Sequence, residues 1–61
     1  MNRRQAAADA VRIALTMTTV PHHYTQTRPH DLVIRAVAHN QYGIDLTDRE
    51  IHDALIEVMG A

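Results

Sequence analysis

The sequence predicts an all-α protein, a small three-helix domain with helices over residues 3–19, 29–42 and 48–60. Each of the three segments carries apolar residues at helical spacing. A stretch rich in threonine and histidine separates the first two, and a glycine followed by a capping motif separates the last two. With 61 residues, the chain is expected to form one domain, residues 1–61.

The first helix is predicted from its alanine, arginine and glutamine residues, which favour helix. Its apolar residues occupy two overlapping helical faces, so the expected apolar arc is broad. Several β-branched residues near its end lower helix propensity, and Pro21 disfavours helical geometry at Val20. We therefore expect the helix to end near Thr18 and a loop to cover residues 20–28.

The second helix is predicted to begin at Pro29, which suits a first helical turn, with Thr27 or Arg28 near the N-cap. Asp31 lies in the positive first turn and precedes Arg35 by four residues, a spacing that permits an ion pair on one helix. Val33, Ala36, Val37 and Asn40 lie on one side of this helix, with Ile34, Ala38 and Tyr42 beside them.

The last helix has the clearest start signal in the chain. Thr47 and Glu50 match a capping box, and Leu46 and Ile51 match the hydrophobic staple that accompanies it. Gly43 suits a left-handed C-cap for the preceding helix. Because the connection is short, the last two helices are expected to form a helical hairpin or corner. The apolar stripe of the last helix consists of Ile51, Ala54, Leu55, Val58 and Met59.

The composition predicts a thin core. The sequence has no cysteine, phenylalanine or tryptophan, so the core must use Ile, Leu, Val, Met and the nine alanines. A chain of this length buries only about 60% of the surface of its unfolded form. We therefore expect apolar helical surface to be shared in a homodimer or with a larger protein partner. The residues expected at that interface are Val11, Leu15, Met17, Ile51, Leu55, Val58 and Met59.

No metal, cofactor or catalytic site is expected. The five histidines include no H-x-x-x-H pair, and a structural zinc site needs four ligands at close quarters. The segment around Gly43 resembles a calcium loop, but its register places Ala38 and Arg49 where calcium needs carboxylates. The chain has no serine or cysteine nucleophile and little room for a pocket of about 300 Å³. An enzyme is therefore not expected.

The segment from Gly43 to Ile51, a glycine-containing turn followed by a capped helix, resembles part of a helix-turn-helix or winged-helix domain. This resemblance implies a DNA-binding transcriptional regulator, as the alternative hypothesis. The net charge of −1 gives it no support, nor does the acidic outer face of the last helix, where Arg49 is expected to pair with Asp53. The candidate nucleic-acid-binding residues are Arg3, Arg4, Arg12, Arg35 and Arg49.

The leading hypothesis is a non-enzymatic protein–protein interaction module. No segment approaches 18 consecutive apolar residues, and Asp9 and Arg12 interrupt the stretch that superficially suggests a signal peptide. A cytoplasmic protein without a membrane partner is therefore expected. Such a protein would be a small regulatory or accessory factor that self-associates or docks on a larger protein. Proteins of this size are common in phages and mobile elements, and this association suggests such a source for the chain.

Overall fold

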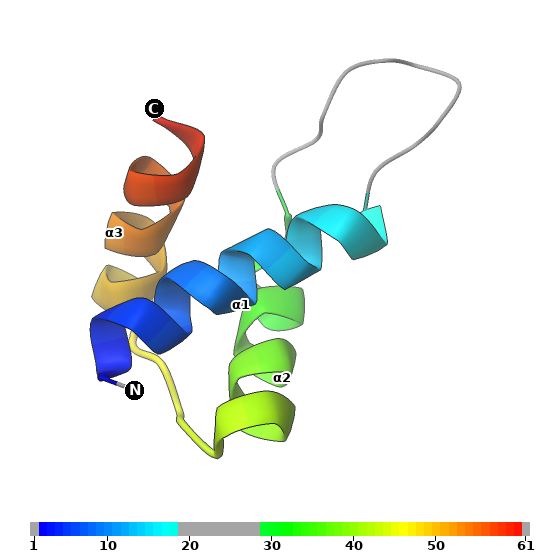
Figure 1. Cartoon of the computed structure of the whole chain (residues 1–61), viewed down its shortest axis with the longest axis vertical. Helices are drawn as coiled ribbons and strands as arrows, with labels where there is room; N and C mark the ends of the chain where they lie inside the picture. The colour runs from blue at the N-terminus through cyan, green and yellow to red at the C-terminus, as the bar shows by residue number, and fades with distance from the viewer. Residues whose placement is uncertain (1, 19–28, 61) are drawn as a thin grey trace.

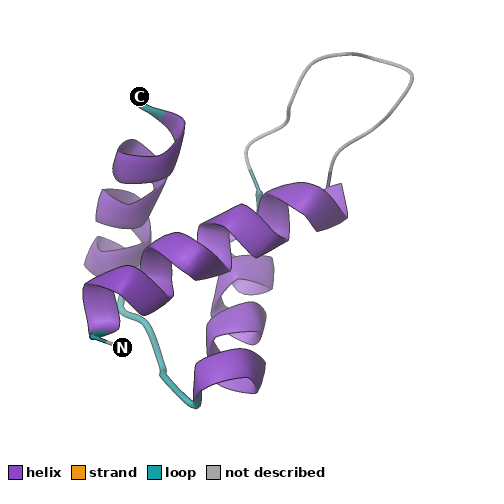
Figure 2. Ribbon diagram, in the orientation of Figure 1, coloured by secondary structure: helices purple, strands orange, loops and turns teal. Residues whose placement is uncertain are grey.

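The computed structural model describes residues 2–18 and 29–60 and contains three helices. They are α1 (Arg3–Thr18), α2 (Asp31–Tyr42) and α3 (Asp48–Met59). Figure 2 shows helices and loops, without any strand, in the described part of the chain. The predicted all-α, three-helix fold is confirmed.

Helix α1 lies across both other helices (Figure 1). The segment 43–47 joins α2 to α3, and the two helices run in opposite directions, within the helical hairpin or corner that the sequence predicts. Each of them packs mainly on α1, whereas they contact each other much less. The core therefore lies between α1 and the α2–α3 pair, and α1 holds that pair together.

The core is built largely from alanine, as the composition predicts. Half of its buried apolar side chains are alanines, and α1 supplies most of these. Because alanine adds little volume, it permits close approach of helices, and a few branched side chains supply most of the remaining core volume. The buried residues of the central cluster are Ala7, Ala10, Val11, Ala14, Leu15, Ile34, Val37, Ala38, Leu46, Ile51, Ala54 and Leu55.

Helix α2 begins later than the sequence predicts, and its N-cap is His30. The imidazole Nδ1 of His30 accepts a hydrogen bond from the backbone N–H of Leu32, at 3.1 Å. Pro29 therefore precedes the cap instead of opening the first turn, and its ring is fully buried. Histidine is outside the usual set of N-cap residues, which explains the wrong prediction. The other proposed caps, Thr27 and Arg28, lie outside the described residues.

The buried face of α2 combines residues from the two adjacent sides that the sequence pattern identifies. Ile34, Val37 and Ala38 are buried, whereas Ala36 and Asn40 are exposed. Packing against α1 determines which of these residues are buried.

The end of α2 and the start of α3 follow the prediction closely. Gly43 adopts a left-handed conformation with φ 65°, and its N–H donates to the carbonyl of His39 at 3.0 Å. The Thr47 hydroxyl accepts from the Glu50 N–H at 3.2 Å, and the Glu50 carboxylate accepts from the Thr47 N–H at 2.9 Å. Leu46 and Ile51, the staple residues, both belong to the core.

None of the helices in the described part of the chain combines the length and apolar character needed to cross a membrane.

Candidate functional site

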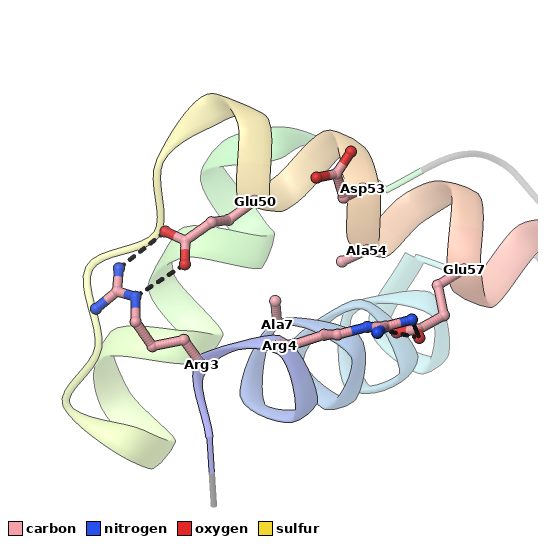
Figure 3. A pocket seen from close by; sticks show the side chains of 7 residues that line it. All are labelled: Arg3, Arg4, Ala7, Glu50, Asp53, Ala54 and Glu57. Carbon is pink, nitrogen blue, oxygen red and sulfur yellow. Dashed lines mark hydrogen bonds and ion pairs between the residues drawn. The ribbon is translucent and has the colours of Figure 1, made fainter.

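A groove of about 520 Å³ lies between α1 and α3 (Figure 3). Its size exceeds what we expected from so short a chain. Ala7 on α1 and Ala54 on α3 lie between two ion pairs that join the helices. The groove therefore has small apolar residues at its centre, with a charged pair on each side of them. The lining residues are Arg3, Arg4, Ala7, Glu50, Asp53, Ala54 and Glu57.

Arg3 joins the start of α1 to the start of α3. Its Nε and Nη2 atoms donate to the two carboxylate oxygens of Glu50, each at 2.8 Å. The Nη2 atom also donates to the backbone carbonyl of Asp45, at 2.8 Å. This two-pronged geometry is the strong form of an arginine–carboxylate contact. It ties the N-terminus of α1 to the connection between α2 and α3.

The Glu50 carboxylate is held strongly in its ionised form. The hydrogen bond from Arg3 lowers its pKa most, the backbone N–H of Thr47 lowers it further, and the pKa falls to about 2. The same contact raises the pKa of Arg3 above its ordinary value. Glu50 is therefore a poor proton donor near neutral pH.

A second ion pair, between Arg4 of α1 and Glu57 of α3, also lines the groove. The Nη2 and Nε atoms of Arg4 lie 2.8 and 3.1 Å from one carboxylate oxygen of Glu57. Arg4 and Glu57 also line a neighbouring hollow of about 590 Å³ along α1, so this pair stands between the two hollows. Both hollows are lined mainly by charged side chains that already have partners.

Each of the five arginines proposed as nucleic-acid contacts is paired with a carboxylate. Beyond the two pairs with α3 residues, Arg12 contacts Asp9 on its own helix at 2.9 Å. Arg35 contacts Asp48 instead of the predicted Asp31, because α3 brings Asp48 to it. Arg49 lies 3.8 Å from Asp53, as predicted. The sixth arginine, Arg28, lies outside the described residues.

The proposed interface residues divide into two groups. The first group is buried within a single copy and consists of Val11, Leu15, Ile51 and Leu55. The second group retains exposed surface: Val58 and Met59 pack on the edge of the core, and the Met17 side chain is 65% exposed. Residues of the first group reach a partner only if helices of one copy separate.

Two further apolar side chains are exposed, and the sequence reasoning missed both. Leu32 is 66% exposed and Ile56 is 44% exposed. Each is adjacent to the apolar stripe of its helix but falls outside the positions that face the core. A helical projection would have identified Ile56, since the stripe of α3 runs through Ile51, Leu55 and Val58.

The described histidines have separate local roles. His30 caps α2, and the Nδ1 of His39 lies 3.1 Å from a carboxylate oxygen of Asp45. His52 is exposed on α3. Within residues 2–18 and 29–60, no three His, Asp or Glu side chains are grouped so that they could hold a metal ion. His22 and His23 lie outside the described residues.

Comparison of the chain with protein-family models, curated proteins and solved structures finds no match. The fold defines the chain as a small three-helix protein.

Proposed function

We propose that this protein is a non-enzymatic protein–protein interaction module, a small regulatory or accessory factor that self-associates or docks on a larger protein. The observation that carries the proposal is the exposure of Met17, Leu32 and Ile56. Each of these side chains leaves apolar surface in contact with water, and burial of that surface against another protein would be favourable.

The charged surface supports a protein partner over nucleic acid. A phosphate must compete with a bound carboxylate at each of the five described arginines. Nucleic-acid-binding domains normally present an excess of unpaired basic side chains on one face. DNA binding by a transcriptional regulator therefore remains the second candidate, supported only by the capped helix that follows the Gly43 turn.

The molecular mass in solution as a function of concentration tests the proposal. We expect the wild-type mass, measured by light scattering or sedimentation equilibrium, to rise from monomer toward dimer. A triple variant with Met17→Gln, Leu32→Gln and Ile56→Gln should remain monomeric over the same range. His52→Gln, an exposed change on α3, is the matched control and should behave as wild type.

A wild type that stays monomeric, and that captures no cellular protein that the triple variant fails to capture, contradicts the proposal. A salt titration of DNA binding tests the second candidate. Affinity that falls steeply with salt, with a slope of about −0.9 per phosphate contact, would favour a DNA-binding regulator.

A further inference from the structure

The buried faces of α2 and α3 form one platform, and α1 covers it. The platform consists of Ile34, Val37 and Ala38 on α2 and Ile51, Ala54 and Leu55 on α3. Because α2 and α3 have few contacts with each other, α1 accounts for most of the cover over these residues. Without a helix in the position of α1, the platform would be an apolar surface with no occupant.

The platform selects its occupant by size and by charge. Ala7, Ala10 and Ala14 are almost completely buried, so only a helix with small residues at this spacing fits at the same depth. Glu50 and Glu57 of α3 each hold an arginine from the first turn of the bound helix. The required occupant is therefore an alanine-rich helix that begins with two arginines.

Helix α1 matches this description, and a second copy of the chain supplies the same helix. Residues 19–28 connect α1 to Pro29 and give a covalent reach of up to about 35 Å. Helix α1 itself is about 24 Å long. The reach of this connection exceeds the length of α1, so the connection does not by itself confine α1 to its own platform.

We propose that two copies of this protein associate by reciprocal exchange of α1, each α1 lying on the platform of the partner. Every contact between α1 and the platform forms again in the exchanged dimer, so the exchange costs little contact energy. It also turns Val11, Leu15, Ile51 and Leu55, which a single copy buries, into residues of the contact between copies. The proposal rests on the proposed self-association: because exchange by itself gains no contacts, burial of the exposed Met17, Leu32 and Ile56 between the copies is what favours the dimer.

Charge reversal across the Arg3–Glu50 pair distinguishes exchange from other modes of association. The Arg3→Glu variant places two acids together, and the Glu50→Arg variant places two arginines together. This holds in the monomer of each variant and in its exchanged homodimer. In an exchanged heterodimer of the two variants, each contact joins opposite charges again. The double variant, with both changes in one chain, should regain the stability of the monomer. It tests whether the pair is tolerated with its charges reversed.

We expect each single variant to melt below wild type. An equimolar mixture, unfolded and refolded together, should form a heterodimer that melts above both variants. Native mass spectrometry, with one variant isotopically labelled, identifies the species. The Arg4→Glu and Glu57→Arg variants provide an independent second pair and should give the same rescue. This pair leaves the capping box of α3 intact.

The matched control is the Arg12–Asp9 pair, both of whose residues lie on α1. Exchange keeps them in the same chain, so a mixture of Arg12→Glu and Asp9→Arg should show no rescue. Absence of a heterodimer for both the Arg3–Glu50 and Arg4–Glu57 pairs would overturn the exchange. Equal rescue in the control would also overturn it. If the wild type dimerises without charge rescue, the proposed self-association stands and the exchange of α1 fails.

Discussion

At the scale of single residues, Leu55 shows how much one side chain contributes to an alanine-rich core. It is buried in a core cluster rich in alanine, whose short side chains cannot extend to fill a vacated space. Leu55→Ala should therefore lower the free energy of unfolding by about 2–5 kcal/mol. A chain of this length has a total stability of only about 3–9 kcal/mol, so much of the variant should be unfolded.

Urea denaturation followed by circular dichroism measures this loss. Ile56→Ala, one position further along α3 and substantially exposed, is the control and should cost much less. Equal losses in the two variants would show that the buried face of α3 is assigned incorrectly.

Glu50 makes the stability of the protein depend on pH in the acid range. Its pKa is lowered from 4.5 to about 2 by the Arg3 guanidinium and then by the Thr47 N–H. A group whose pKa is depressed on folding contributes stability above its unfolded pKa, and that contribution disappears as pH falls toward the folded pKa. We therefore expect the contribution of Glu50 to be complete above about pH 5 and to decline between about pH 4.5 and pH 2.

The comparison that isolates this effect is wild type against Glu50→Gln at several pH values. Wild type should be more stable at pH 6, and the difference should narrow steadily as the pH approaches 2. Added salt should also narrow the difference at pH 6, because the pair is exposed to solvent. A difference that does not change with pH would mean that the carboxylate charge contributes nothing.

At the scale of helices, the start of α3 depends on the Thr47 hydroxyl. That hydroxyl accepts the hydrogen bond of the Glu50 N–H, which would otherwise have no partner within the helix. Thr47→Ala should cost about 0.5–2 kcal/mol. Thr47→Ser keeps the hydroxyl and should retain most of the stability in the same thermal melts. If serine is as damaging as alanine, the cap is not the cause.

Helix boundaries were predictable from the sequence where the deciding interaction is local. The capping box of Thr47 and Glu50 and the left-handed Gly43 each involve residues within a few positions of one another. The same locality explains the Arg49–Asp53 pair, since both residues lie on one exposed helix face. Local signals of this kind depend on neighbouring residues and not on how the helices pack together.

Interactions between helices were not predictable in the same way. Arg35 was expected to pair along its own helix with Asp31, but the packing of the helices brings Asp48 to it. The Arg3–Glu50 contact joins residues 47 positions apart, and no pattern in the sequence links them. The candidate groove between α1 and α3 is a product of such contacts, so only the structure reveals it.

At the scale of the whole molecule, α1 is the element on which the other two depend. It packs on both of them, while they have few contacts with each other. Loss of α1 packing should therefore unfold α2 and α3 together with α1, in one cooperative transition. A molecule with three independently stable helices would behave differently, because one helix could separate while the other two persisted.

Ala10→Leu tests this dependence directly. Ala10 is fully buried on α1, so three added carbon atoms must push α1 away from its neighbours. Overpacking of this kind typically costs about 1–3 kcal/mol. Because Leu is a good helix former, the change does not weaken α1 itself. Amide hydrogen exchange should show α2 and α3 losing protection in step with α1, whereas Ala36→Leu, at an exposed position of α2, should leave protection unchanged. Loss of protection confined to α1 would show that α2 and α3 hold together without it.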